Sequence, residues 1–399
     1  MKKILRFFLR FVLLFAIVLF AVLFSFYLMA PVYQFSGPVP FQGNKLYNPY
    51  SQMNASHWRL YNFQVQSRAW GGLTNGRKNS NELIDSVYHA LGFDYVATSD
   101  YQKINTHGKE KANYIPTYEH GYNIFRTHQV CIGADEVLWT DFILFQTLSM
   151  KQWVIDLLDK RSEIVVLAHP LLNNGYTLDN LKYLTNYEMM EVLGNLFLSI
   201  KHWDVALSSG QLAWVMGNDD AHDVMGPSEV ARKFTLVNSK STQADEIIAN
   251  LKIGNNYAVD YFSSTKTTLA DKVAMLKKLP YLKSAELQGD TFTVSVSKMA
   301  REIRFIGENG LVKKTIPNTK STSYVIQAED PYIRTEISFA YDYVFFLNPV
   351  VRYEGKHPKS QKTATIDASA TLRLRIIYFL VILSLVYLYA KRKQKRAAK

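Results

Sequence analysis

Two long apolar runs, one near each end of the chain, place the strongest constraint on its fold. Phe11 to Ala30 is a run of twenty apolar or weakly polar residues, and at about 1.5 Å per residue it is long enough to cross a hydrocarbon core of roughly 30 Å. Ile376 to Ala390 is shorter, and it can cross if Arg373 and Arg375 extend toward the headgroups. Both runs predict transmembrane helices, so the lipid bilayer is the first expected partner.

A cleaved signal peptide is the alternative interpretation of the first run. Such a peptide has a shorter apolar region and ends in small residues at the cleavage site. Residues 28–30, Leu-Met-Ala, offer no clear site of that kind. We therefore predict a retained N-terminal transmembrane helix within residues 1–30, and a C-terminal transmembrane helix with a basic tail within residues 372–399.

The basic residues that give the chain its net charge of +12 lie beside the two apolar runs. Residues 1–30 contain four Lys or Arg, residues 372–399 contain eight, and neither segment contains an acidic residue. Residues 31–371 are therefore neutral, which argues against nucleic acid as a partner. By the positive-inside rule, both termini are cytoplasmic and residues 31–371 are extracytoplasmic, or periplasmic if the source is bacterial.

Short apolar runs alternate with amphipathic segments over residues 58–265. This alternation is typical of α/β folds with a parallel sheet. Polar residues follow several of the apolar runs, as they do at the C-terminal face of a barrel. We expect strands at 58–65, 93–99, 130–132, 163–168, 190–193, 212–216 and 234–237, and helices at 81–91, 149–160, 178–184, 200–209 and 242–252.

The pattern changes after a helical linker predicted at 266–283. Residues 284–353 contain short segments such as Thr291 to Ser297, in which apolar and polar residues alternate with a period of two. This periodicity, with turns between the segments, predicts a small antiparallel β domain. The remaining segments are an extended lead-in at 31–57 and a juxtamembrane linker at 354–371.

Asp220 and His222 follow the apolar run Trp214 to Met216 and are two residues apart. Side chains at this spacing point to the same side of an extended backbone, and carboxylate oxygen with imidazole nitrogen suits zinc, manganese or iron. A buried hydrogen-bonded pair is the alternative. Other polar residues near predicted strand ends are Gln64, Gln66, Asp100, Glu119, His128, His169 and Glu191.

Three segments in this order resemble the PHP (polymerase and histidinol phosphatase) domain family. Residues 167–170, Leu-Ala-His-Pro, resemble its Ala-His-Pro strand end, and residues 217–222, Gly-Asn-Asp-Asp-Ala-His, resemble its closing Asp-x-His. Residues 81–100 resemble its first helix–strand unit. The resemblance covers about residues 58–260 and implies a distorted (β/α)₇ PHP-like barrel.

The resemblance also implies a cluster of up to three divalent metals that hydrolyses phosphate esters. A bridged metal pair makes hydroxide available near neutral pH and neutralises charge on phosphoryl oxygens. By this resemblance, one metal would be held by Glu119, His128 and His169. Asp220 or His222 would orient the attacking water or act as a general base.

The sequence departs from the family pattern at other ligand positions. Gln64 and Gln66 stand where the family has His-x-His, and an amide oxygen is a poorer zinc ligand than imidazole. Ser99-Asp100-Tyr101 replaces Thr-Asp-His, and Thr74-Asn75-Gly76 replaces Ser-Asp-Gly. At most one metal site keeps its full ligand set, so we expect one ion or none. Gln64, Gln66 and Asp100 are then candidates for substrate contacts.

Two hypotheses follow from these residues. The favoured one is a membrane-anchored PHP-like protein with a depleted metal site, weakly active or non-catalytic, that binds a phosphorylated or other anionic ligand or a partner protein. The alternative is a metal-dependent phosphoesterase that uses a single metal at Glu119, His128 and His169. Structural roles stay open for all three: a solvated carboxylate in a polar loop for Glu119, a core histidine for His128, and a loop hydrogen bond for His169.

Overall fold

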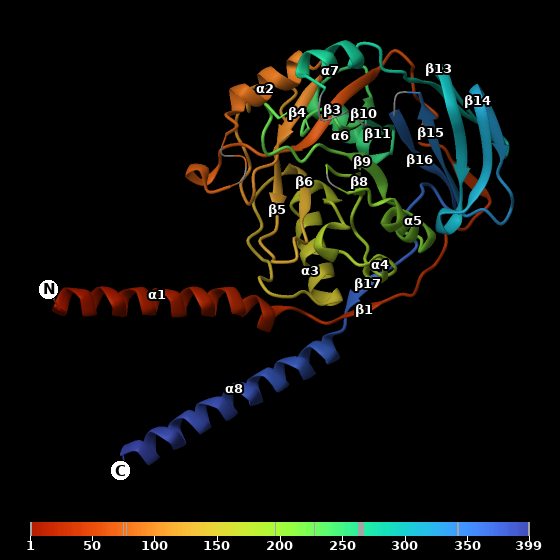
Figure 1. Ribbon diagram of the computed structural model, residues 1–399. Helices are drawn as coiled ribbons and strands as arrows, with labels where there is room; N and C mark the ends of the chain where they lie inside the picture. The colour runs from red at the N-terminus through yellow and green to blue at the C-terminus, as the bar shows by residue number, and fades with distance from the viewer. Residues whose placement is uncertain are drawn as a thin grey trace.

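The computed structural model describes residues 2–74, 76, 78–195, 197–226, 228–261, 267–340 and 343–397. Asn75 and the expected boundary between residues 265 and 266 lie outside the described residues. Two long helices, α1 (Lys2–Met29) and α8 (Ala368–Ala397), extend from one side of a folded body (Figure 1). Among the described residues, these are the two helices long and apolar enough to cross a membrane.

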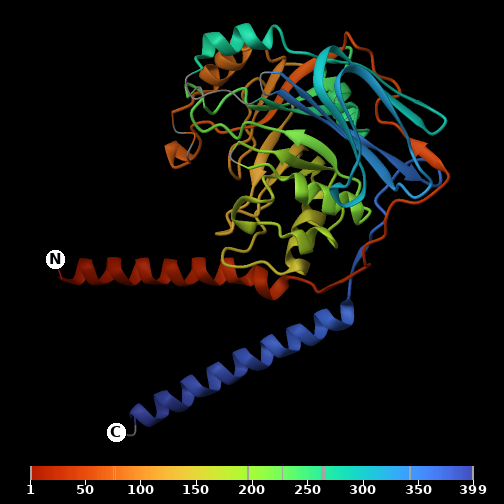
Figure 2. The same cartoon turned by 45° about the vertical axis from the view of Figure 1, so that its right-hand side comes forward.

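A short two-stranded ribbon joins the bases of these helices. β1 (Tyr33–Phe35) pairs antiparallel with β17 (Ala364–Ile366), and the Arg375 guanidinium donates to the carbonyl of Met29 over 3.3 Å. Both helices therefore leave the body close together and on the same side (Figure 2). Two membrane helices that enter from one bilayer surface need this arrangement.

The first sheet has five strands in sequence order. β5 pairs antiparallel with β6, and β6 with β7, whereas β7, β8 and β9 are parallel neighbours. Most of these strand residues are buried on both faces, as in sheets covered by helices. The strands are β5 (Thr117–His120), β6 (Gln129–Ala134), β7 (Ser162–Leu167), β8 (Met189–Leu193) and β9 (Trp214–Gly217), and the helices between them are α3 (Leu148–Asp159), α4 (Leu178–Leu181) and α5 (Ile200–Ser208).

The second sheet has ten strands, which come from the N-terminal and the C-terminal parts of the folded body's sequence. Its main order is β12-β13-β15-β16-β11-β10-β3-β4, with β14 paired to β13 and β2 paired to β16. Only β3 and β4 are parallel among these pairs of described strands. The strands are β2 (Lys45–Tyr47), β3 (Trp58–Val65), β4 (Tyr95–Thr98), β10 (Lys233–Asn238), β11 (Asn256–Tyr261), β12 (Leu282–Gln288), β13 (Thr291–Ile306), β14 (Val312–Val325), β15 (Tyr332–Phe339) and β16 (Tyr343–Tyr353), with helices α2 (Asn81–Ala90), α6 (Ala244–Lys252) and α7 (Leu269–Leu276).

An apolar layer fills the space between the two sheets. Tyr61 and Phe63 from β3 share this layer with Ile164 and Val166 from β7 and with Met216 from β9, and all five are fully buried. Predicted site residues follow closely in sequence after each of these strands: Gln66 after β3, His169 after β7 and Asp220 after β9. The site therefore has a rigid apolar floor, which limits the movement of the side chains above it.

The sheet topology agrees with the expected mixture of helices and strands, but the strands do not form one continuous barrel sheet. The hydrogen bonds between the described strands form two sheets rather than one closed sheet. Single bridges, Val65 with Ala221 and Tyr101 with Glu119, connect the ends of the two sheets. The strands expected as a small β domain at 284–353 are antiparallel, but β16 pairs with β11 and so continues the second sheet.

The sequence did not predict β1, β2, β5, β11 and β17, and one helix begins differently. In β5 and β11 polar residues interrupt the apolar pattern, although all of β5 and most of β11 are buried. Helix α3 begins at Leu148, one residue before the predicted start, and is capped by Thr147, whose hydroxyl accepts from the amide of Met150. The hydroxyl of Ser149, the predicted first residue of this helix, accepts a hydrogen bond from the amide of Tyr33.

Candidate metal centre

Glu119, His128 and His169 come from three adjacent strands of the first sheet. Glu119 lies on β5, His128 directly precedes β6, and His169 follows β7. In the β6–β7 register Gln129 lies opposite Leu167, so His128 reaches Ala168, whose amide donates to the His128 carbonyl over 3.2 Å. The antiparallel pairing thus brings residues 50 positions apart in sequence to one end of the sheet.

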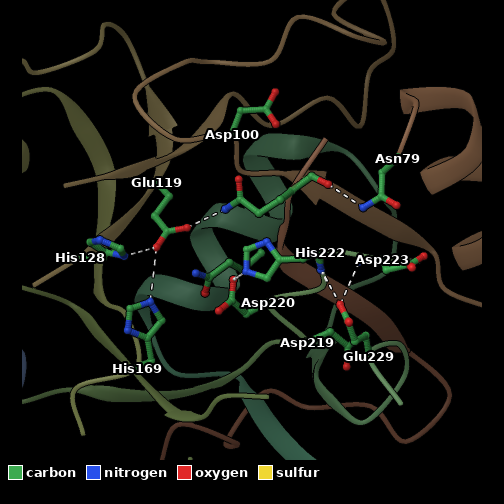
Figure 3. A network of polar contacts seen from close by, with 12 residues as sticks. Asn79, Asp100, Glu119, His128, His169, Asp219, Asp220, His222, Asp223 and Glu229 are labelled. Carbon is green, nitrogen blue, oxygen red and sulfur yellow. Dashed lines mark hydrogen bonds and ion pairs between the residues drawn. The ribbon is translucent and has the colours of Figure 1, made fainter. Parts of the chain in front are cut away.

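The three side chains converge on one point (Figure 3). Their ligand atoms all lie within 4.8 Å of one another. Glu119 Oε1 lies 2.6 Å from His128 Nδ1 and 3.3 Å from His169 Nε2. All three residues are buried, and Glu119 is fully so. One carboxylate and two imidazoles at this spacing can hold one divalent metal.

Asp220 and His222 face the same space from the end of β9 (Figure 3). His222 Nε2 lies 3.6 Å from Asp220 Oδ1. The loop is held by Glu229, whose carboxylate accepts from the amides of His222 and Asp223 over 2.8 Å each. Asp219 has a different role, because its carboxylate accepts hydrogen bonds from Tyr88 and from three backbone amides, and it therefore fixes the strand end.

Two of these residues have a left-handed backbone conformation. The φ angle is 29° at His169 and 46° at Asp220, a region that costs a side-chain-bearing residue on the order of 1 kcal/mol. The Glu191 carboxylate holds the first of these turns, because it accepts the His169 amide over 2.8 Å. Strain of this kind persists where surrounding structure fixes it, and it is concentrated at functional sites.

Several buried polar atoms around this space have no hydrogen-bond partner among the described residues. Buried polar groups in native proteins are nearly always paired, and leaving one unpaired costs about 1–3 kcal/mol. A cluster of such atoms therefore indicates a ligand. The atoms are Gln64 Nε2 and Oε1, Gln66 Oε1, His128 Nδ1, His169 Nδ1, Glu191 Oε1, Asp220 Oδ1 and His222 Nδ1; His128 Nδ1 is close to Glu119 but is not aligned for a hydrogen bond.

The electrostatics of the centre also favour a cation. Burial raises the pKa of Glu191 to about 8 and, together with the Glu119 carboxylate, raises the pKa of Asp220 to about 6. Burial alone would raise the pKa of Glu119, but His128 and His169 outweigh it and lower this pKa below its ordinary value. Burial acts to lower the pKa of His169, but hydrogen bonding to Glu119 and the nearby carboxylates raise it to about 9. Three buried carboxylates thus repel one another, and a divalent cation would relieve this repulsion.

The residues predicted to contact a substrate differ in how free they are. Gln66 Nε2 donates to Glu119 Oε2 over 2.6 Å, so this amide orients the carboxylate. Gln64 is fully buried and neither of its amide atoms has a partner among the described residues. Asp100 uses both oxygens, because Ser67 and Asn105 donate to them. Of the three, Gln64 has the side chain most available to a ligand.

Some surroundings of the centre differ from those expected from the sequence. Glu119 is not in a solvated polar loop, because it lies on the buried strand β5. His120, for which no role was predicted, is fully buried between Gln129 and the carbonyl of Thr140. Tyr101, which packs on the His128 ring with centroids 5.5 Å apart, was not assigned a role. A short strand composed mostly of polar residues, such as β5, carries no hydrophobic signal, so only the fold reveals its burial.

Comparisons with known proteins add little to this geometry. No protein-family model matches the chain, and no curated protein matches it. Among solved structures, the chain is similar to a two-domain protein from Bacteroides vulgatus that is described as containing a predicted PHP-like metal-dependent phosphoesterase. The two share 12% sequence identity with a TM-score of 0.36, over 83% of this chain and 99% of that chain.

Proposed function

We propose that this protein is a membrane-anchored hydrolase of phosphate esters that works with one divalent metal held by Glu119, His128 and His169. The observation that carries the proposal is the convergence of these ligand atoms to within 4.8 Å of one another in a buried setting. The unpartnered atoms of Asp220, His222 and Gln64 support it, because they supply proton-accepting and hydrogen-bonding groups beside the ligands.

The proposed division of labour follows from the chemistry of each side chain. A divalent metal would neutralise charge on phosphoryl oxygens and make hydroxide accessible near neutral pH. Asp220 and His222 would orient the attacking water and accept its proton, since they face the same space as the ligands (Figure 3). Gln64 would donate from its amide to a substrate oxygen. Zinc, manganese and iron all suit a carboxylate–imidazole ligand set.

The architecture that we propose is a distorted (β/α)₇ barrel. Its seven strands would be β6, β7, β8 and β9 of the five-stranded sheet and β10, β3 and β4 of the larger sheet, which share one apolar interior. We further propose that α1 and α8 span a membrane with both termini in the cytoplasm, and that the folded body is extracytoplasmic. The basic residues flanking the apolar runs support this orientation.

A specific contact favours a second candidate, a ligand-binding protein without turnover. Gln66 donates to Glu119 Oε2, so this oxygen already has a hydrogen-bond partner and is less available to hold a second metal. A site limited to one metal lacks the paired-metal clamp that stabilises both the attacking and the leaving oxygen. In this second function the centre would bind a metal and an anionic ligand but would not cleave the ligand.

Elemental analysis and hydrolysis assays on the purified full chain separate the two candidates. We expect about one divalent metal per chain, and metal-dependent hydrolysis of p-nitrophenyl phosphate or bis(p-nitrophenyl) phosphate that a chelator abolishes. His169→Ala should remove both metal and activity, whereas the exposed His357→Ala should change neither. Bound metal without turnover would overturn the hydrolase and favour the ligand-binding protein. Absence of metal from both the natural protein and His357→Ala would overturn both candidate functions.

A further inference from the structure

A group of exposed apolar side chains lies on the loops near the metal centre. We call the side chains of Trp70, Leu73, Ile124, Phe125, Trp139, Leu144 and Phe145 the apolar rim. Leu73 is 90% exposed, and Ile124 and Trp139 are each more than half exposed. Single exposed apolar residues are ordinary, but a group of seven, four of them aromatic, on neighbouring loops marks an interaction surface.

The apolar rim is connected to the metal centre by direct contacts. The Trp70 indole donates to the carbonyl of Tyr101 over 2.7 Å, and the Tyr101 ring packs on His128. Trp70 and Trp139 have ring centroids 6.2 Å apart. Since His128 ends the loop that carries Ile124 and Phe125, the apolar rim borders the centre on this side.

The apolar rim is also continuous with the end of helix α1. The hydroxyl of Tyr27 accepts from the amides of Leu144 and Phe145, over 2.9 and 3.2 Å. The Tyr27 ring lies 5.0 Å from the ring of Phe145, and the Ile124 amide donates to the Ile143 carbonyl, which joins the two loops. The loops of the apolar rim therefore begin where the apolar helix ends.

Aromatic side chains lead from the helix into this surface. Phe20, Phe24 and Tyr27 stack successively along α1. Tyrosine and tryptophan favour the boundary between hydrocarbon and water, because one end of the side chain is apolar and the other forms hydrogen bonds. The exposed Arg126 lies in the same loop as Ile124 and Phe125, where its charge suits an anionic headgroup.

From these contacts we propose that the apolar rim rests in the surface of the bilayer beside α1, and that the metal centre acts on the phosphate ester of a membrane lipid. This proposal depends on the hydrolase function proposed above and specifies its substrate class. The lipid tail stays in the membrane while the headgroup reaches Glu119, His128 and His169. For a phosphate monoester, the oxygen of water bonds to phosphorus, the ester P–O bond breaks, and the lipid oxygen takes up a proton. The products are inorganic phosphate and a lipid alcohol.

Tryptophan fluorescence tests the membrane contact without any need for activity. Of the six tryptophans in the chain, the two in the apolar rim are the exposed ones, and neither apolar helix contains a tryptophan. We expect the full chain in nanodiscs of brominated phosphatidylcholine to lose a substantial part of its emission relative to unbrominated nanodiscs. Trp139→Phe should remove much of that quenching, whereas Trp153→Phe, a partly buried residue outside the apolar rim, should leave it in place. Equal emission in the two lipids would overturn the membrane contact.

Substrate preference tests the lipid assignment. We expect Ile124→Ser/Phe125→Ser to lower the ratio of phosphatidic acid turnover to p-nitrophenyl phosphate turnover at least tenfold. Leu311→Ser, which alters a side chain of 60% exposure outside the apolar rim, should leave this ratio unchanged. An unchanged ratio in the double variant would overturn the lipid assignment. The assignment would also be overturned if the ratio fell because a soluble partner protein, and not the lipid, binds these residues.

The two readouts distinguish failure of this inference from failure of the hydrolase function. Quenching by brominated lipid with no hydrolysis of either phosphate ester would overturn the hydrolase and its substrate while the membrane contact stands. Hydrolysis of p-nitrophenyl phosphate with no quenching and no turnover of phosphatidic acid would overturn the lipid proposal alone.

Discussion

Two buried clusters of charged residues in this protein differ in how their polar atoms are satisfied. In the first, Arg334 on β15 donates from Nε and Nη2 to the Asp204 carboxylate over 2.7 and 3.0 Å, and from Nη1 to Glu336 over 2.5 Å. Its guanidinium also stacks over the ring of Trp203. In the metal centre, by contrast, carboxylates and imidazoles leave several buried atoms without partners among the described residues.

This difference separates a structural cluster from a functional one. The Arg334 cluster fixes helix α5 against the second sheet, and each nitrogen of the guanidinium already has an acceptor. It needs no further component. The metal centre has an excess of acceptors that repel one another, so a bound cation would complete it. Burial of charge is common to both clusters, and the state of hydrogen bonding is what distinguishes them.

The largest effect is expected from breaking the structural cluster. Arg334→Leu should lower the free energy of unfolding by about 3–5 kcal/mol, because Asp204 would be left buried without a countercharge and Glu336 would keep only its pair with Arg304. Thermal unfolding of the full chain in detergent measures this loss. Arg304→Gln, a change at the more exposed end of the cluster, should cost much less. A variant as stable as the natural protein would show that the two clusters do not differ in this way.

The next effect concerns completion of the metal centre. Adding zinc to chelator-treated protein at about 100 times its dissociation constant should stabilise the fold by about 2.7 kcal/mol. The rise in melting temperature should be absent in His128→Ala and retained in Arg334→Leu, even though the latter starts from a lower stability. Stabilisation of His128→Ala by zinc would show that the metal binds elsewhere.

A smaller effect should follow from loss of the amide that orients Glu119. Gln66→Ala removes the 2.6 Å hydrogen bond to Glu119 Oε2, and loss of such an orienting partner weakens metal affinity on the order of tenfold. Isothermal titration with zinc measures the change. Gln211→Ala, which alters a buried glutamine bonded to the carbonyl of Tyr187, is the matched control and should bind zinc normally. Unchanged affinity in Gln66→Ala would contradict an orienting role.

The smallest expected effect concerns the carboxyl group of Glu188, which directly precedes β8 and is not one of the proposed metal ligands. Burial raises the pKa of Glu188 from its ordinary 4.5 to about 7. Because the pKa of Glu188 is higher in the folded than in the unfolded protein, the protonated carboxyl favours the folded state. This contribution to stability is complete below about pH 4.5 and is lost as the pH rises through 7. Glu188→Gln cannot titrate, so between pH 5 and 8 its stability should rise relative to the natural protein by about 1 kcal/mol, a figure reduced for partial exposure. Denaturant unfolding at several pH values measures this, and the exposed Glu110→Gln should show no such trend.

The sequence predicted local elements well where the hydrophobic pattern was strong. Strand β3 occupies Trp58–Val65 as expected, and helix α2 occupies Asn81–Ala90, one residue shorter than predicted. Prediction failed at Thr117–His120, whose polar residues do not alternate with apolar ones although every one is buried. It also failed to show that β16 joins β11, because pairing between distant strands depends on tertiary contacts.

The sequence alone determined the two apolar helices and the polar strand ends, because length, hydropathy and local periodicity are properties of short segments. It also identified Glu119, His128 and His169 as candidates, through resemblance to a family pattern. Only the tertiary structure decided that these three converge, since their approach depends on the register of β5, β6 and β7. The same holds for the apolar rim, whose side chains are scattered over residues 70–145 and become one surface only when Tyr27 and the loops pack together.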